Sequence, residues 1–478
     1  MAVRRGPLSP AQRSLWLLEK MGLSGVYHNL LSVTLSGPVD RPALERALVA
    51  VAARHEALRT RFAEASGVVE QEVLRAPPLI LEDLSAAAGV PRPATVQEAA
   101  SRAGTWASKP FALSAGPPVR VSLTPAGGED HLLVIAAHHL VSDGDSMMIV
   151  LGELLALYEA QLAGAPDPLP PPQAQFLDLV SGAQAAREAP EASLAFWRDH
   201  LGGAPAVLDL PLDRLRPARP TYRGAVRRWV LQPSTVAAVR ELARGQRVSV
   251  FMTVLAMLGV LLTRLAGTGE VVVGVPVSLR RDARSQATVG YLVNTIAVRL
   301  SVREDQTAEE LLTAVRRVML RAYDRSHVPF DAVVRELRPP RRPDHHPVFQ
   351  VLAAFTDRGD SASAHFARRI AGLDLAFPDV EPGTARTDIS FCIHEVAGTL
   401  AVDVEHAADL CDPPTAAALA EALESLLLAA ARDPAQLVAT RPLGQQPPGP
   451  ARRAARRPPA SSRQPGWPDR LGVLLARA

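Results

Sequence analysis

The chain has 478 residues, of which 47% are apolar and 21% charged, and this is enough to bury the cores of two or three domains. The net charge of +3 is too small to indicate a nucleic-acid partner. Cys392 and Cys411 are the only cysteines, and their spacing indicates neither a disulfide framework nor a metal site.

The N-terminal residues 1–7 are not followed by an apolar segment long enough for a signal peptide. The sequence contains no 18-residue apolar span free of charge. We therefore expect a cytoplasmic, soluble protein without a membrane partner.

The first third of the chain predicts alternating helices and strands. A helix begins at Pro10, because Ser9 is a good N-cap and proline is favoured at the first helical position. The further predicted elements are a strand over 29–35, a helix over 42–55, a helix over 94–111, a strand over 118–123, a strand over 131–135 and a helix over 147–160.

Between the last two of these elements lies the segment His138-His139-Leu140-Val141-Ser142-Asp143-Gly144. Because neighbouring strand residues point to opposite faces, one histidine is expected to pack while the other faces a cavity. Asp143 and Gly144 stand at the turn into a helix, whose first N–H groups favour nearby negative charge. An imidazole, a carboxylate and a glycine that permits close approach therefore meet in one segment. The structural alternative is a turn with buried histidines and Asp143 or Ser146 as N-cap.

The second part of the chain begins after a proline-rich connector over 164–172. The predicted elements are a helix over 192–201, a strand over 225–231, an apolar helix over 248–265, a strand over 270–277 and a closing helix over 413–431. From residue 444 the chain is rich in proline, arginine, alanine and serine, with too little apolar surface to pack. This composition predicts a disordered tail.

The histidine segment resembles the HHxxxDG motif of the condensation domains of nonribosomal peptide synthetases, within the chloramphenicol acetyltransferase-like superfamily. Four further segments resemble that family: 9–16 is similar to the opening SxAQxRLW pattern, with Ser14 in place of the usual arginine, 54–62 to RHExLRTxF, 289–299 to GxFVNTxxxR, and 347–351 to P(L/V)FQV. The resemblance extends over roughly residues 8–443 and involves several motifs in order.

The resemblance implies an α/β fold of two chloramphenicol acetyltransferase-like lobes, arranged as a V-shaped pseudo-dimer with a tunnel between them. We place the N-terminal lobe in residues 1–177, the C-terminal lobe in 178–443 and the disordered basic, proline-rich tail in 444–478. Because the chain begins almost at the first motif and carries no adenylation or carrier domain, we expect a free-standing monomer.

The resemblance also implies a condensation enzyme of natural-product biosynthesis, such as the biosynthesis of antibiotics. Such an enzyme joins an acyl or aminoacyl thioester donor to an amine, or an alcohol, and forms an amide or an ester. Its substrates are carried on the phosphopantetheine of partner carrier proteins, although a small-molecule acceptor also fits. The enzyme itself is expected to bind no cofactor.

The resemblance assigns roles to the residues of the motif. His139 is expected to take the proton released as the new bond forms, because an imidazole titrates near ~6.5, or else mainly to orient the nucleophile. Asp143 is expected to orient the site rather than act as a second base, and His138 to support the fold. Gly144 leaves room for the substrate, and the N–H groups that follow it are expected to stabilise the oxyanion.

Two residues outside the motif complete the predicted site. Arg280 aligns with the arginine of a family turn and is expected to pair with Asp143 from across the lobe interface, because a buried carboxylate needs a cation. Asn294 lies in the GxFVNTxxxR segment as a supporting residue, or as no more than a strand-end hydrogen-bonding residue. His345 and His346 lack a third histidine nearby, so we expect a polar loop there and no metal.

Alternative functions remain open at this point. A carrier-independent acyltransferase that uses acyl-coenzyme A belongs to the same superfamily. A non-catalytic module that recruits carrier proteins has no need of His139, so the intact motif argues against it. A serine hydrolase is disfavoured, because the sequence contains no G-x-S-x-G turn.

Overall fold

The computed structural model describes residues 2–75, 79–85, 92–185, 191–340, 342, 344–356, 369–396 and 398–440. Contacts divide the chain into two compact units. Unit 1 comprises Met1–Ala189, Ser278–Asn294 and Gly359–Thr384, and unit 2 comprises Pro190–Val277, Thr295–Arg358 and Ala385–Ala478.

These units are not two successive stretches of chain, as the expected lobes 1–177 and 178–443 would be. Two later segments belong to unit 1 because their apolar side chains bury in its core. Val289 is 2% exposed and Leu373 is 1% exposed, and both lie in the same cluster as the N-terminal core residues. The expected tail over 444–478 lies outside the described residues.

The central sheet of unit 1 has six strands in the order β12-β13-β2-β7-β6-β5. Their bounds are β2 His28–Ser36, β5 Leu81–Glu82, β6 Val119–Pro125, β7 Asp130–His138, β12 Arg369–Ile370 and β13 Leu373–Ala376. Only the β5–β6 pair is parallel, and the other neighbours are antiparallel. The sheet thus joins strands from the start of the chain to two strands that come more than 330 residues after β2 along the chain.

A smaller antiparallel sheet of unit 1 has the order β1-β4-β3. Its strands are β1 Ala2–Pro7, β3 Thr60–Ala65 and β4 Val68–Leu74. The first strand was not predicted, since residues 2–7 carry two arginines and a proline and show no apolar alternation.

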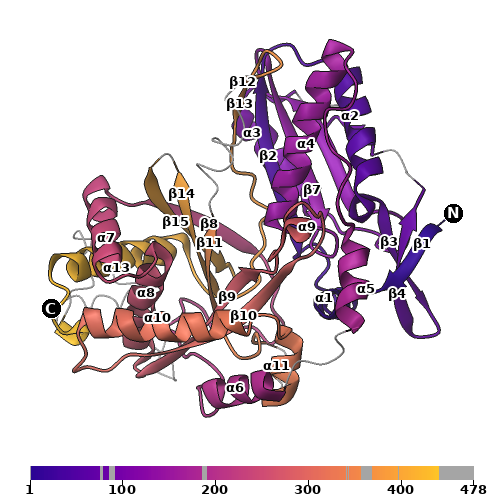
Figure 1. Ribbon diagram of the computed structural model, residues 1–478. Helices are drawn as coiled ribbons and strands as arrows, with labels where there is room; N and C mark the ends of the chain where they lie inside the picture. Colours follow the sequence, from indigo (N-terminus) through magenta and orange to yellow (C-terminus); the bar gives the residue numbers. More distant parts are fainter. Residues whose placement is uncertain are drawn as a thin grey trace, which may run out of the picture. The chain divides into compact units, whose positions relative to one another are not determined.

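Helices cover both faces of the central sheet of unit 1. Its helices are α1 Pro10–Lys20, α2 Arg41–Arg54, α3 Val96–Ala107, α4 Gly144–Ala163, α5 Phe176–Ala185 and α9 Ala283–Gln286. Figure 1 shows α2 and α4 side by side, and the two helices enclose the main core with β2 and β7. A second core forms where α3 packs against the alternate residues of β7, among them Leu132, Val134 and Ala136. Strand β7 is therefore apolar on both faces, as a buried strand requires.

Unit 2 contains the other six-stranded sheet, in the order β10-β9-β11-β14-β15-β8. Its strands are β8 Gly224–Val230, β9 Glu270–Ser278, β10 Val293–Ser301, β11 Val351–Thr356, β14 Ile389–Val396 and β15 Thr399–Ala407. The pairs β9–β11 and β11–β14 are parallel, whereas β14–β15 and β15–β8 are antiparallel. Its helices are α6 Glu191–Leu201, α7 Pro233–Gly245, α8 Val250–Ala266, α10 Ala308–Asp324, α11 Phe330–Leu337 and α13 Pro413–Arg432. The predicted α/β class is correct for both units.

Two described helices, α4 and α13, are long and apolar enough to cross a membrane by length and composition, and the bent pair α7 and α8 would add a third span. However, 50% of the α4 window and 56% of the α13 window are buried inside the protein. Leu151 and Leu154 of α4, and Leu426 and Leu427 of α13, are fully buried. Packing within each unit therefore accounts for their apolar character.

Candidate active site

The two histidines of the motif differ in environment, as the alternation along the strand predicted. His138 ends β7 and is 1% exposed, whereas His139 begins the following turn and is half-buried. The Nε2–H group of His138 donates to Glu19 Oε1 at 2.9 Å, and its Nδ1 accepts from the Leu140 N–H group at 3.0 Å. Both ring nitrogens of His138 thus have structural partners.

A buried polar cluster surrounds His138. Burial opposes ionisation of Glu19, but the hydrogen bond and charge of His138, together with the hydrogen bond from Ser24 and the nearby His28, lower the pKa of this carboxyl below its ordinary value. His28 lies with its ring centroid 5.6 Å from that of His138, and its Nδ1–H group donates to the Ala107 carbonyl oxygen at 2.7 Å. Burial lowers the pKa of His28 to about 4, so this ring is neutral at neutral pH.

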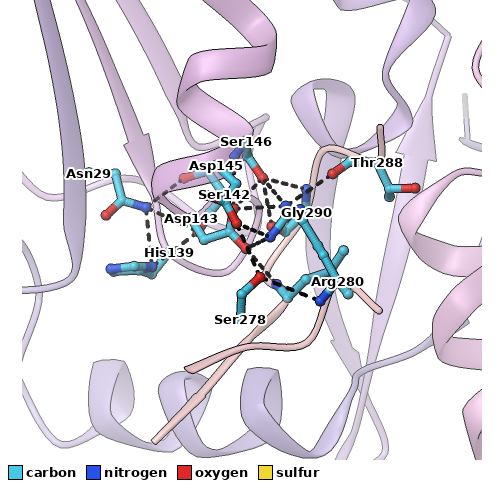
Figure 2. A network of polar contacts seen from close by, with 11 residues as sticks. Asn29, His139, Ser142, Asp143, Asp145, Ser146, Ser278, Arg280, Thr288 and Gly290 are labelled. Carbon is cyan, nitrogen blue, oxygen red and sulfur yellow. Dashed lines mark hydrogen bonds and ion pairs between the residues drawn. The ribbon is translucent and has the colours of Figure 1, made fainter. Parts of the chain in front are cut away.

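His139 is held at its main chain and at one ring nitrogen. Its backbone N–H donates to the Tyr27 carbonyl oxygen at 2.8 Å. Figure 2 shows the ring of His139 next to Asn29 and Ser142. Its Nδ1 lies 3.1 Å from the Ser142 carbonyl oxygen and 3.1 Å from Asn29 Nδ2. The ring centroid of Tyr291 lies 5.3 Å from that of His139. The contacts at Nδ1 fix the plane of an imidazole that still reaches the protein surface.

Asp143 is fully buried and acts as the N-cap of α4. One carboxylate oxygen accepts from the Ser146 N–H group at 2.9 Å and from Ser146 Oγ at 2.7 Å, and the other accepts from the Leu292 N–H group at 2.8 Å. Arg280 donates to both oxygens, at 2.6 and 2.9 Å. The carboxylate therefore has partners on every side and is poorly placed to accept a proton from a substrate.

The expected ion pair between Arg280 and Asp143 is present (Figure 2). The side chain of Arg280 is only 5% exposed, and it also donates to Ser146 Oγ and to the Thr288 carbonyl oxygen. The expectation that the pair crosses between lobes is wrong, because both residues belong to unit 1. The segment 278–294 returns to unit 1 to supply this cation.

Gly290 ties the returning segment to the start of α4. Its N–H donates to Ser146 Oγ at 3.0 Å, and its carbonyl oxygen lies 2.8 Å from the same hydroxyl. A Cβ at this position would lie 2.3 Å from the ring of Phe176, so only glycine permits this close approach. The glycine of the GxFVNTxxxR-like segment thus has a packing reason.

No close packing requires a glycine at position 144. It is exposed at the first position of α4, and a Cβ there would meet no protein atom within 4 Å. The N–H groups of the first helical turn have no acceptor inside a helix. Space for a ligand next to these groups is consistent with the predicted role of Gly144.

Two further residues of the site were not singled out from the sequence. Gln12 is fully buried and donates from Nε2 to the Leu140 carbonyl oxygen at 2.7 Å, so it supports the histidine turn from α1. Asn29 of β2 donates to Ser142 O and Ser142 Oγ at 3.0 Å each. Gln12 lies within the opening family-like segment, but no spacing along the chain pointed to Asn29.

Asn294 is 7% exposed at the second residue of β10. His345 pairs with Asp344, Nδ1 to Oδ1 at 2.9 Å. In the parts of the chain that the structure describes, no three histidine, cysteine or acidic side chains are grouped so that they would hold a metal ion.

Comparison with known proteins finds one family model, described as the condensation domain, which matches residues 4–445. Among curated proteins, malpinin synthetase of Mortierella alpina is 33% identical over 445 residues, covering 91% of this chain and 6% of its own length. The dimodular nonribosomal peptide synthase of Bacillus subtilis (strain 168) is 33% identical over 453 residues, covering 90% of this chain and 18% of its own. The chain thus spans a small fraction of these relatives.

Two solved structures are similar over their whole length. The X-domain from teicoplanin biosynthesis is 28% identical with a TM-score of 0.80, covering 92% of this chain and 98% of its own. SgcC5 of Streptomyces globisporus, solved with (R)-(-)-1-(2-naphthyl)-1,2-ethanediol and sucrose, is 25% identical with a TM-score of 0.74, covering 90% and 99%.

Proposed function

The chain belongs to the condensation-domain family, and we propose that it transfers an acyl or aminoacyl group from a carrier-bound thioester to an amine and so forms an amide bond. The observation that carries this proposal is the intact motif. His139 is half-buried, whereas Asp143 is fully buried and both of its carboxylate oxygens accept hydrogen bonds from other residues of the protein.

The proposed partners are peptidyl or acyl carrier proteins, which present the thioester on a phosphopantetheine arm. The match to a nonribosomal peptide synthase supports these partners, since such a synthase assembles peptides in steps. The protein itself would need no bound cofactor, because the energy of the thioester drives amide formation. We propose that it works in the cytoplasm as a soluble monomer.

The proposed reaction is attack by the acceptor nitrogen on the thioester carbonyl carbon. The new C–N bond forms, the C–S bond breaks, and the phosphopantetheine thiolate leaves. His139 Nε2 takes the proton from the nitrogen and gives it to the departing sulfur. An imidazole suits both steps near neutral pH, because its ordinary pKa of about 6.5 allows it to accept and return a proton.

The other residues support this step. Asp143 and Arg280 hold the end of β7, the start of α4 and the segment 278–294 in fixed positions. The first N–H groups of α4, beside Gly144, are proposed to stabilise the negative charge on the carbonyl oxygen, an effect worth about 3 kcal/mol per donor. His138 supports the turn through Glu19, and Asn294 is proposed as a supporting residue at the start of β10.

An alcohol is the second proposed acceptor class, and it would give an ester. SgcC5, which this chain resembles over nearly its whole length, was solved with a diol. The attacking oxygen would lose its proton to His139 Nε2 in the same way.

The test of the proposed function uses two carrier proteins. One carries an aminoacyl or fatty-acyl group on its phosphopantetheine, and the other carries an amino acid or is replaced by a free amine or alcohol. A panel of donors and acceptors is screened, and product is detected by intact-protein mass spectrometry. We expect product with the wild type and none with His139→Ala, whose folding is checked by circular dichroism. Equal turnover by His139→Ala contradicts the proposal.

The same assay distinguishes the two alternatives. Product formed from acyl-coenzyme A without any carrier would identify a carrier-independent acyltransferase. Carrier binding without product over the whole panel, unaffected by His139→Ala, would identify a non-catalytic recruiting module.

A further inference from the structure

The Asn29 side chain of β2 contacts a ring nitrogen of His139. Its Nδ2 is 3.1 Å from His139 Nδ1 and 3.0 Å from both the carbonyl oxygen and the hydroxyl of Ser142 (Figure 2). Strand β2 presents it there because His28 pairs with His138 and Asn29 with Ala137 at the end of the β2–β7 ladder. Asn29 therefore bridges β2 to the histidine turn.

Counting protons at this cluster selects one tautomer of His139. If Nδ1 carries the proton, it donates to the Ser142 carbonyl, and the two amide protons of Asn29 go to that carbonyl and to Ser142 Oγ. Three hydrogen bonds form, and the hydroxyl of Ser142 still donates to the His138 carbonyl oxygen, while the 3.1 Å contact between Asn29 Nδ2 and His139 Nδ1 then joins two donors. If Nδ1 is unprotonated, it accepts from Asn29 Nδ2 but faces the Ser142 carbonyl oxygen as a second acceptor at 3.1 Å. Only two hydrogen bonds then form, because the two amide protons of Asn29 have to serve three acceptors.

We propose that Asn29 is the positioning residue of His139: its amide holds the Ser142 carbonyl where that oxygen accepts the Nδ1 proton, which leaves Nε2 as the nitrogen that takes a proton from the acceptor. This inference rests on the condensation activity proposed above. Asn29 acts through the carbonyl and the ring, so it is not a catalytic residue.

The group that orients His139 is a neutral amide, whereas the neighbouring His138 contacts a carboxylate. The proton on His138 Nε2 is held by a carboxylate, Glu19, whereas the proton on His139 Nδ1 is held by a carbonyl. Of the acidic groups in the motif, Asp143 has its oxygens bound to Arg280, Ser146 and Leu292, and Asp145 accepts from Ser278 and Arg280. An orienting group without charge does not favour the imidazolium, so it keeps the ring ready to accept a proton.

The experiment measures the His139 ring itself by NMR of protein labelled with nitrogen-15 in histidine. The His139 signals are those missing from His139→Ala. Wild type should carry the neutral-state proton on Nδ1. Asn29→Ala should reduce the ratio of Nδ1–H to Nε2–H tautomer by about tenfold, because the carbonyl loses its fixed position, and should lower kcat by a similar factor with little change in KM.

Asn29→Asp supplies the second variant. It places a negative charge next to Nδ1, so the midpoint of the His139 titration, and with it the acid limb of the pH–rate profile, should rise by about 1 pH unit or more. Ser32→Ala is the matched control, because Ser32 also lies on β2 and loses a buried hydrogen bond, to the Pro378 carbonyl, on the other face of the strand. It should change neither the tautomer ratio nor the titration.

The proposal is overturned if His139 keeps its tautomer ratio in Asn29→Ala, or if its titration midpoint stays in place in Asn29→Asp. Neither measurement of the ring needs a substrate. A failed condensation assay would therefore leave the role of Asn29 standing, and an unchanged ring would leave the proposed reaction standing.

Discussion

Removing the cation of the buried ion pair should destabilise unit 1 strongly. Asp143 is fully buried and Arg280 is 5% exposed, so Arg280→Met leaves a carboxylate without its cation in a site that water cannot reach. Breaking a buried pair in this way costs about 3 to 5 kcal/mol. Arg280 also donates to Ser146 Oγ and the Thr288 carbonyl, which places the expected loss toward the upper end of that range.

The measurement is urea unfolding monitored by hydrogen exchange of peptides from α4 and 278–294. Because these peptides belong to unit 1, their exchange reports the unfolding of unit 1 separately from that of unit 2. Lys20→Met is the matched control in unit 1, since its ion pair with Glu64 is exposed on both sides and such pairs are worth roughly 0 to 1 kcal/mol. A loss below about 1 kcal/mol, or one equal to that of Lys20→Met, would refute the reasoning.

Two further outcomes are expected. Gly144→Val should leave the unfolding free energy within about 1 kcal/mol of wild type, because a Cβ there meets no protein atom, but should lower kcat/KM at least tenfold if substrate occupies that space; unchanged kinetics would contradict the role of Gly144. The pKa of His28 is lowered by burial to about 4 from an unfolded value near 6.5, so its contribution to stability is present above about pH 6.5 and is lost as the pH falls toward 4. Between pH 7 and pH 5 the loss of unfolding free energy from His28 amounts to about 2 kcal/mol. Chemical denaturation at both pH values should therefore show a weaker pH dependence of the unfolding free energy for His28→Gln than for wild type. An equal pH dependence in the two proteins would contradict this role of His28.

Much of the fold around the site could be predicted because the local signals are strong. Ser9 and Gln12 form the capping box that starts α1, and the predicted strand over 29–35 lies within β2. The alternation of faces along a strand predicted that His138 and His139 would differ in environment, and they do, although β7 ends at His138 and His139 lies in the following turn.

The rest depended on contacts between distant parts of the chain. No local pattern indicates that 278–294 packs in unit 1. This packing depends on the burial of Val289 in the core of unit 1 and on the ion pair that Arg280 forms with the buried Asp143. Asn29 was not predicted either, since a single asparagine in a strand carries no periodic signal and its partner Ser142 lies 113 residues away. The ion pair itself was predicted from the family resemblance, and the cost of a buried carboxylate was the physical reason to expect a cation, but its location within one unit was not predicted.

The pairing of Leu35 with Leu375 has a consequence for synthesis of the protein. While the chain emerges from the ribosome, β2 and its neighbours are complete long before β13 exists, so the open edge of β2 has to wait for about 190 further residues after α5. At 5 to 20 residues per second this takes roughly 10 to 40 s. During that interval the open edge of β2, a strand with four apolar residues among its nine, is available to other nascent chains. Expression at lower temperature or with a holding chaperone should therefore improve the yield of correctly folded protein.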